Sequence, residues 1–272
     1  MKVVILCGGQ GTRLREHTEH LPKPLVDIGG RPILWHIMRS FAHHGHTEFV
    51  LCLGYKGWKI KEWFLDYDAR VHDVTIELGT NRPTLHREPE TVGWKVTLVD
   101  TGDAAMTGAR IARVAEHLDG ERFMVTYGDG VSDVDIEQLL AFHQASGKQA
   151  TVTGVHPPAR FGELMIDGDE VRAFSEKPQV TDSWINGGFF VFERSVLDRL
   201  STDDDCVLER EPLESLARDG ELGAYRHEGF WQCMDTYRDW KALNERWLAG
   251  DAPWAEAWRR PRPQRIAQWE AA

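Results

Sequence analysis

The sequence predicts an α/β fold in which helices cover both faces of a mixed, mostly parallel β-sheet. Short apolar segments rich in Val, Phe and Thr recur along the first half of the chain, and amphipathic segments lie between them. This alternation is typical of parallel strands, which are buried on both faces. The strands are expected at residues 3–7, 49–53, 96–99, 123–126 and 151–155.

The predicted helices lie between these strands. The first follows Pro32, a residue that suits the first turn of a helix, and its apolar residues Ile33, Ile37, Met38 and Phe41 recur at helical spacing. Similar spacing predicts helices around residues 60–64, 111–118 and 136–143.

The second half of the chain has a different pattern. Residues 163–166 and 171–175 flank Asp167-Gly168-Asp169-Glu170, which is a typical hairpin turn. A further strand is expected at 189–192, with helices at 213–217 and 240–247. We therefore expect one domain over residues 1–250, whose late part is a small β-rich elaboration of the sheet.

A C-terminal tail is expected over residues 251–272. It carries Trp254, Trp258 and Trp269, so we expect it to pack on this chain or on a neighbouring one. Arg259-Arg260-Pro261-Arg262 is interpreted as solvated.

Composition and charge exclude several classes of protein. The chain has 272 residues, with 32 Lys and Arg against 43 Asp and Glu, giving a formal net charge of −11. Its ordinary share of hydrophobic residues excludes collagen, a disordered chain and a coiled coil. The negative charge argues against binding to nucleic acid or to an anionic membrane, because both require a positive surface.

The cysteines and the N-terminus predict a soluble cytoplasmic protein. The four cysteines show no C-x-x-C spacing, so neither a zinc site nor a redox motif is indicated, and free thiols fit a reducing compartment. The apolar run at 3–7 is too short for a signal peptide or a membrane span.

A glycine-rich loop, Cys7-Gly8-Gly9-Gln10-Gly11-Thr12-Arg13-Leu14, follows the first predicted strand. Its backbone can approach a ligand closely, and its N–H groups can hold an anion. Ligands of open α/β sheets bind beyond the carboxyl ends of the strands, where this loop lies. The guanidinium of Arg13 suits a phosphate, although a plain tight turn is the alternative.

Two better-known glycine motifs do not fit this loop. A dinucleotide fingerprint beginning at Gly9 needs Gly or Ala where Leu14 stands, which disfavours a nicotinamide-dependent oxidoreductase. A P-loop beginning at Gly8 needs Gly-Lys where Arg13 and Leu14 stand.

Lys23 lies between two prolines in Leu21-Pro22-Lys23-Pro24-Leu25. The prolines restrict the backbone on both sides, which would hold the lysine in one direction. Ten residues after Arg13, it could return to the same ligand; the alternative is a surface lysine in a rigid loop.

Gly-Gly-x-Gly-Thr-Arg followed by Pro-Lys-Pro resembles the signature of the sugar-1-phosphate nucleotidylyltransferases. The resemblance covers residues 2–254, is weak over 79–94, and is closest to the branch that acts on CTP and glucose 1-phosphate. Cys7 departs from the Ala of many members, and Cys233 from the Pro usual in this branch. The matching segments are 30–38, 96–102, 106–108, 126–130, 186–190 and 230–236.

The resemblance implies a Rossmann-like core, a Mg²⁺ cofactor, and formation of CDP-glucose and pyrophosphate from CTP and glucose 1-phosphate. It implies a nucleotide-binding part over about 1–130 and a sugar-phosphate-binding part over about 131–250. It also implies a homo-oligomer, a trimer or a hexamer. Sister enzymes using dTTP, UTP, ATP or another sugar phosphate remain the alternative, as does a non-catalytic nucleotide-sugar-binding subunit.

In such a reaction a sugar-phosphate oxygen attacks the α-phosphorus, which requires positioning and charge neutralisation rather than a protein nucleophile. The resemblance assigns catalysis to Arg13, Lys23 and Asp129, and the metal to Asp129 and Asp235. From the residues alone, Asp129 could instead form a turn, and Asp235 could cap a helix over 236–243.

The resemblance also assigns residues to the nucleotide. Cytosine differs from uracil by its 4-amino donor, so we expect acceptors there, such as backbone carbonyls near Gly8 or Tyr127. Arg110, at the start of the helix expected over 111–118, could bond the pyrimidine carbonyl or a phosphate, or could be a surface arginine. The nucleotide-binding set is Leu6, Gly8, Gly9, Gly11, Thr12, Arg13, Lys23, Thr107, Arg110, Tyr127 and Gly128.

For the sugar phosphate, the resemblance indicates that Lys177, fixed by Pro178, contacts the phosphate. Glu176 and Asn186 would bond sugar hydroxyls, and Gly187 and Gly188 would allow close approach. A solvated Glu-Lys pair is the alternative. The one histidine cluster, His43-His44-x-His46, is interpreted as imidazolium at a helix end rather than as a metal site.

Overall fold

The computed structural model describes residues 1–9, 11, 14, 19–80, 82–86, 93–157, 163–167, 170–175 and 183–259. Four predicted site residues, Thr12, Arg13, Glu176 and Lys177, lie outside the described residues, as does the chain from residue 260 onward, including Trp269.

The centre of the molecule is a mixed sheet of eight strands in the order β13-β10-β14-β8-β1-β4-β7, with β15 paired to β10. The strands that come first in the chain are parallel to one another: β1 (Lys2–Leu6), β4 (Glu48–Leu53), β7 (Lys95–Asp100) and β8 (Arg122–Tyr127). The later ones are β10 (Ala150–Val155), β13 (Ile185–Asn186), β14 (Phe190–Glu193) and β15 (Leu222–His227).

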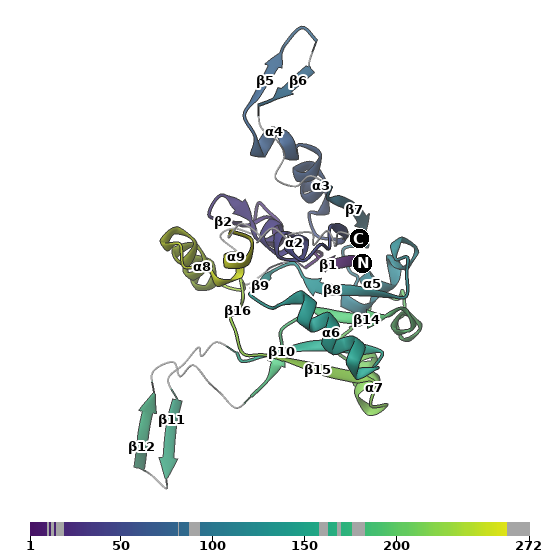
Figure 1. Cartoon of the computed structure of the whole chain (residues 1–272), viewed down its shortest axis with the longest axis vertical. Coiled ribbons are helices and arrows are strands. Elements are labelled where there is room, and N and C mark those ends of the chain that lie inside the picture. Colours follow the sequence, from purple (N-terminus) through teal and green to yellow (C-terminus); the bar gives the residue numbers. More distant parts are fainter. Residues whose placement is uncertain are drawn as a thin grey trace, which may run out of the picture.

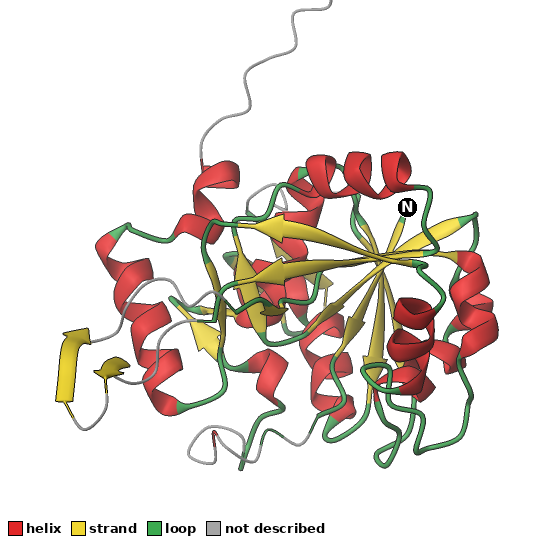
Figure 2. Ribbon diagram, turned by 90° about the horizontal axis from the view of Figure 1, so that it is seen from below, coloured by secondary structure: helices red, strands yellow, loops and turns green. Residues whose placement is uncertain are grey.

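The antiparallel strand β14 joins these two halves of the sheet. It pairs with β8 on one side and with β10 on the other, while β15 runs parallel to β10. Figure 2 shows the strands fanning out between helices on both sides. The predicted mixed, mostly parallel sheet is therefore confirmed.

The two faces of the sheet have separate apolar cores, because side chains of a buried strand alternate between faces. Val3 and Ile5 of β1 point into one core, and Val4 and Leu6 into the other. The first core is covered by α2 (Ile33–His43), α3 (Gly57–Leu65), α6 (Ile136–Ser146), α8 (Tyr237–Ala249) and α9 (Pro253–Arg259). The second is covered by α5 (Thr107–Arg113), η4 (Arg194–Arg199) and α7 (Glu211–Arg218).

Smaller elements surround the sheet. The predicted hairpin is present as β11 (Glu163–Asp167) and β12 (Glu170–Ser175), and β5 (Val74–Glu77) with β6 (Arg82–Leu85) projects from the body in Figure 1. The other short elements are η2 (Lys23–Leu25), β2 (Asp27–Ile28), β3 (Arg31–Pro32), α4 (Tyr67–Val71), η3 (Ala115–His117), β9 (Gly130–Ser132) and β16 (Trp231–Cys233).

The helix expected over 111–118 has different bounds. It begins at Thr107 and ends at Arg113, and a 3₁₀ turn follows at 115–117. Gly108 in its first turn packs closely against Cys206: a Cβ there would lie 2.6 Å from Cys206 Sγ. Arg110 is therefore in the last turn of α5 rather than at its start.

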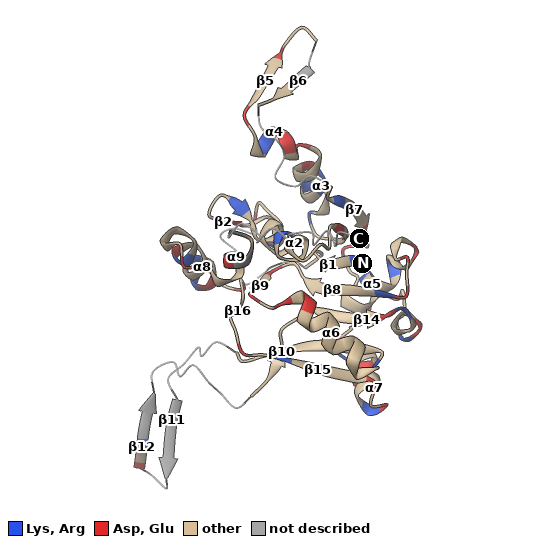
Figure 3. Cartoon of the chain, viewed as in Figure 1, with Lys and Arg blue, Asp and Glu red and all other residues tan. Residues whose placement is uncertain are grey.

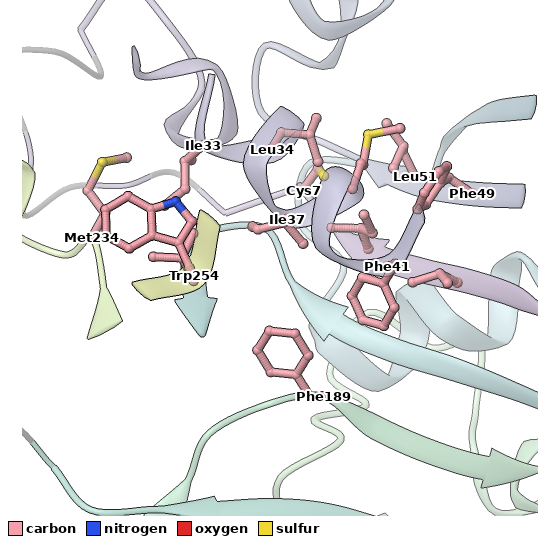
Figure 4. Close-up of a cluster of buried hydrophobic side chains, with 14 of the residues drawn as sticks. Cys7, Ile33, Leu34, Ile37, Phe41, Phe49, Leu51, Phe189, Met234 and Trp254 are labelled. Carbon is pink, nitrogen blue, oxygen red and sulfur yellow. The ribbon is translucent and has the colours of Figure 1, made fainter. Parts of the chain in front are cut away.

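The segment after residue 250 packs on this chain. Trp254 of α9 is 1% exposed, and its ring stacks on Phe230 with centroids 5.5 Å apart. Its indole N–H donates to Nδ1 of the buried His36 at 3.3 Å, and His36 Nε2 donates to the Ile28 carbonyl at 2.9 Å. Figure 4 shows Trp254 beside Met234 and Ile33 in the first core. Ala252, Trp254 and Ala255 are thus part of the core, which confirms that this segment packs, and it packs on this chain.

Replacing Trp254 with alanine is expected to lower the free energy of unfolding by about 3–5 kcal/mol, because it leaves a large cavity and removes the donor to His36. Urea denaturation measures this loss. The matched control is Trp58→Ala, whose side chain is 61% exposed and whose loss should change stability by no more than about 0.5 kcal/mol. Equal effects of the two substitutions would contradict the packing described for α9.

The histidine cluster lies at the end of α2, as predicted, with His43 as the last helical residue and His44 as the cap. His46 is not an imidazolium, however, because burial lowers its pKa to about 4. Within the described ranges, no group of three or more His, Cys, Asp or Glu side chains is placed to hold a metal ion.

The four cysteines are free thiols, as the sequence predicts. Acidic and basic side chains are distributed over many helices and loops (Figure 3). In the part of the chain that the structure describes, none of the helices has the length and apolar character needed to cross a bilayer.

Candidate active site

A pocket of about 250 Å³ lies at the carboxyl ends of β1 and β8, where the sequence places the ligand. Most of the predicted nucleotide-binding residues line it, together with Asp129. Its walls are Leu6, Cys7, Gly8, Gly9, Lys23, Pro24, Ala105, Met106, Thr107, Arg110, Tyr127, Gly128 and Asp129. Gly11, which has a φ of 61°, is described but is not one of the lining residues.

Lys23 lies between the two predicted metal-binding carboxylates. Its Nζ is 2.6 Å from Asp129 Oδ2 and 2.5 Å from Asp235 Oδ1. Burial alone would lower the pKa of Lys23, but the charges and hydrogen bonds of Asp129 and Asp235 raise it overall. The side chain is therefore a buried ammonium, and the surface-lysine alternative is wrong because Lys23 is only 9% exposed.

The chain brings the two carboxylates together through a short antiparallel pair. Gly130 of β9 pairs with Cys233 of β16, and the Asp129 carbonyl accepts a hydrogen bond from the Met234 N–H at 2.8 Å. Asp129 directly precedes Gly130, and Asp235 follows Cys233 by two residues. Both carboxylates therefore reach the Lys23 ammonium.

Asp235 does not cap the helix that follows it. Thr236 is the N-cap of α8, and its hydroxyl accepts from the Asp239 N–H while the Asp239 carboxylate accepts from the Thr236 N–H. This capping box satisfies the helix terminus, which leaves the Asp235 carboxylate for Lys23.

The carboxylates of Asp129 and Asp235 fit a divalent cation. Carboxylate oxygens are the ligands that Mg²⁺ prefers, and one or two of them, with substrate phosphates and water, are typical of its sites. The ammonium of Lys23 shows that a positive charge is stable between them.

Arg110 is not a surface residue. It is 5% exposed, and its Nη1 donates to the Leu53 carbonyl at 2.9 Å and to the Gly102 carbonyl at 2.9 Å. Its Nη2 donates to the Gly8 carbonyl at 3.2 Å. Burial lowers the pKa of Arg110. The guanidinium therefore connects the glycine loop by hydrogen bonds to the carboxyl ends of β4 and β7.

Gly8 leaves the room that this guanidinium needs. A Cβ at position 8 would lie 2.1 Å from Arg110 Cζ. Arg110 could move away only by giving up several buried hydrogen bonds. Gly8→Ala is therefore expected to lower the free energy of unfolding by about 1–3 kcal/mol, as measured by urea denaturation.

The matched control for this prediction is Gly9→Ala. A Cβ at Gly9 would meet nothing within 4 Å, so the substitution should leave the stability nearly unchanged. If Gly8→Ala proved as stable as Gly9→Ala, the stabilising role assigned to the hydrogen bonds of Arg110 would be refuted.

The predicted sugar-binding residues Asn186, Gly187 and Gly188 lie beside Tyr127. Asn186 Nδ2 donates to Tyr127 Oη at 2.9 Å, and the Gly188 N–H donates to Asn186 Oδ1 at 2.9 Å. Gly188 has a φ of 79°, which favours glycine, and a Cβ at Gly187 would lie 2.6 Å from Val155 Cγ1. Burial raises the pKa of Tyr127, and so does the neighbouring carboxylate of Glu209.

Glu209 was not predicted from the sequence. Its carboxylate accepts hydrogen bonds from Tyr127 and Thr107, two residues that line the pocket. The surrounding residues, Leu208-Glu209-Arg210-Glu211, have the composition of an ordinary charged surface segment. No local signal could have identified it, because its role depends on packing against Thr107.

A family model described as "Nucleotidyl transferase" matches residues 2–231, and the chain belongs to this family. Among its relatives is the glucose-1-phosphate cytidylyltransferase of Salmonella typhi, 52% identical over 255 residues, which are 93% of this chain and 98% of that protein. The probable glucose-1-phosphate cytidylyltransferase of Bacillus subtilis (strain 168) is 45% identical over 254 residues, covering 93% of this chain and 99% of the relative.

Solved structures support the fold. HddC from Yersinia pseudotuberculosis superposes with a TM-score of 0.65 at 24% identity, covering 90% of this chain and 99% of that one. A UDP-glucose pyrophosphorylase complexed with UDP-glucose gives a TM-score of 0.66 at 14% identity, covering 92% and 98%. The Rossmann-like core that the sequence resemblance implies is thus confirmed.

Proposed function

We propose that this chain is a Mg²⁺-dependent cytidylyltransferase that forms CDP-glucose and pyrophosphate from CTP and glucose 1-phosphate. The observation that carries the proposal is the convergence of Lys23, Asp129 and Asp235 beside a pocket walled by the glycine loop. The nucleotide and the sugar follow from relatives at 45% and 52% identity over nearly the whole chain.

Asp129 and Asp235 would hold Mg²⁺, in keeping with the general use of a divalent metal ion in this family. When bound, the ion would neutralise charge on the phosphate oxygens. Lys23 adds a fixed positive charge, and the glycine loop offers backbone N–H groups to phosphate. Catalysis then comes from orienting a sugar-phosphate oxygen toward the α-phosphorus while pyrophosphate leaves.

Further contacts stay predictions. Thr12 and Arg13 are assigned to the nucleotide, with Arg13 facing phosphate; Lys177 is assigned to the phosphate of the sugar, and Glu176 to its hydroxyls. Asn186, Gly187 and Gly188 would face the sugar, because they adjoin Tyr127 at the pocket wall.

We also propose that the protein is a cytoplasmic homo-oligomer, a trimer or a hexamer, that binds neither nucleic acid nor membrane. Large apolar side chains support subunit contacts: Leu65 is 84% exposed, Leu78 is 91% exposed and Leu248 is 81% exposed. Sedimentation velocity tests the assembly, and a monomer at micromolar concentration would contradict it.

The function is tested by pyrophosphate release. The protein is incubated with glucose 1-phosphate and CTP, UTP, dTTP or ATP in turn, with Mg²⁺ or with a chelator, and then with other sugar phosphates. CTP with glucose 1-phosphate should give the highest kcat/KM, and the chelator should stop the reaction. A preference for dTTP or UTP would contradict the cytidylyltransferase assignment, and CTP binding without turnover would indicate a non-catalytic subunit.

A further inference from the structure

Glu209 lies behind the pocket wall and accepts hydrogen bonds from two hydroxyls of that wall. Tyr127 Oη donates to Glu209 Oε1 at 2.5 Å, and Thr107 Oγ1 donates to Glu209 Oε2 at 2.6 Å. Thr107 and Tyr127 both line the pocket, whereas Glu209 does not. One half-buried carboxylate therefore connects the first turn of α5 with the end of β8.

The direction of the Tyr127 proton is fixed by its neighbours. The Gly188 N–H can only donate, so the Asn186 atom facing it at 2.9 Å is the amide oxygen. The Asn186 NH₂ group then faces Tyr127 Oη, which must accept. The Tyr127 proton consequently goes to Glu209, an acceptor only.

The Thr107 hydroxyl is fixed in the same way. The Leu208 N–H donates to Thr107 Oγ1 at 2.9 Å, so the hydroxyl accepts there and gives its proton to Glu209. Among the residues that the structure describes, each hydroxyl has used its one proton, and each keeps one unused lone pair. Toward a ligand, Thr107 and Tyr127 can therefore accept a hydrogen bond but cannot donate one.

The part of the pocket formed by Ala105, Met106 and Thr107 suits a base rather than a phosphate. These residues carry no charge, and Met106, at 45% exposed, offers apolar surface for an aromatic ring. The nearby guanidinium of Arg110 is engaged with backbone carbonyls, and the Gly8 carbonyl already accepts from Arg110 and from the Tyr55 N–H. The hydroxyls of Thr107 and Tyr127 are thus acceptors left for the base.

We propose that Glu209 is a positioning residue that makes this wall select cytosine over uracil. Cytosine has an amino donor at position 4, which can bond an oriented oxygen, whereas uracil has a carbonyl that would face a lone pair. A site built to bond a particular donor rejects the analogue that lacks it. The inference rests on the proposed cytidylyltransferase function and names the group behind its nucleotide choice.

The test is the ratio of kcat/KM for CTP to that for UTP in Glu209→Gln. The glutamine oxygen can accept a hydrogen bond from only one of the two hydroxyls, Thr107 or Tyr127. The glutamine NH₂ group must donate to the remaining hydroxyl, whose own proton then points away from residue 209. We expect the CTP-to-UTP ratio to fall by about tenfold or more. The matched control is Glu214→Gln, the same change at an exposed carboxylate nearby, which should leave the ratio unchanged.

A second pair of variants keeps the test decisive if Glu209→Gln does not fold. Thr107→Val removes the hydroxyl with little change of shape and should lower the CTP-to-UTP ratio. Thr107→Ser restores the hydroxyl and should restore the ratio. An unchanged ratio in folded Glu209→Gln, or in Thr107→Val where the first variant cannot be prepared, would overturn the proposal.

These outcomes are separable from failure of the proposed function. A wild-type protein that does not turn over CTP refutes the function and this inference with it. A wild-type protein that prefers CTP, combined with a Glu209→Gln variant of undiminished preference, refutes only the role of Glu209.

Discussion

Replacing Asp129 with asparagine is expected to lower kcat/KM for CTP and glucose 1-phosphate by about 10²–10³-fold. Asparagine has nearly the same shape but no charge, so the pocket would keep its form and lose one of the two carboxylates proposed to hold Mg²⁺. Lys23 would still bond Asp235, so the fold should persist. Pyrophosphate release measures the loss, and the melting temperature confirms folding.

Asp68→Asn is the control for this variant, because it removes an equal charge from an exposed position in α4. It should leave kcat/KM unchanged. Turnover by Asp129→Asn at the wild-type rate, at saturating and at limiting Mg²⁺, would show that the Asp129 carboxylate is not part of the reaction.

Lys23→Met is expected to affect both turnover and stability. Without the ammonium, the carboxylates of Asp129 and Asp235 face one another in a partly buried site, at 30% and 22% side-chain exposure. Their repulsion should lower the free energy of unfolding by about 1–3 kcal/mol in the presence of a chelator. Thermal unfolding in chelator and in Mg²⁺ measures this effect.

Mg²⁺ should stabilise Lys23→Met more than the wild type, because the ion no longer competes with an ammonium for the same two carboxylates. Lys241→Met, at an exposed lysine that pairs with Glu245, should respond to Mg²⁺ as the wild type does. An equal response of Lys23→Met and the wild type would place the metal elsewhere.

The pH dependence of this stabilisation has a defined sign. The folded state raises the pKa of Lys23 above its usual value of 10.5, so the ammonium stabilises the fold fully at neutral pH. The advantage of the wild type over Lys23→Met should be constant from pH 7 to 9. It should be lost as pH rises through the raised pKa, above 10.5.

Most of the sheet could be predicted because its strands are short runs rich in Val, Phe or Thr that are soon followed by glycine or proline. The strand β15 was not predicted, because Leu222–His227 is not such a run. The glycine loop and Asp129 could be predicted because they directly follow strands, and Lys23 because it stands in a short Pro-Lys-Pro motif. These features are local, so spacing and composition carry them.

The features that could not be predicted from the sequence depend on contacts between segments that are distant along the chain. Arg110 has the sequence context of a surface arginine, but it is buried and donates hydrogen bonds to the carbonyls of Gly8, Leu53 and Gly102, among other acceptors. Glu209 likewise depends on Thr107 and Tyr127. The α5 helix begins earlier than expected, and its first residues Thr107-Gly108-Ala109 carry no large apolar side chain from which amphipathic spacing could be read.

The cluster of Lys23, Asp129 and Asp235 joins residues that are synthesised far apart in time. Lys23 is 106 residues from Asp129 and 212 residues from Asp235 along the chain. Asp235 reaches the cluster through β16, and α8 and α9 pack behind it only when residues up to about 259 are available. A ribosome-bound chain that has completed the nucleotide pocket therefore still lacks a carboxylate, so nascent chains would remain inactive until residues up to about 259 have been synthesised.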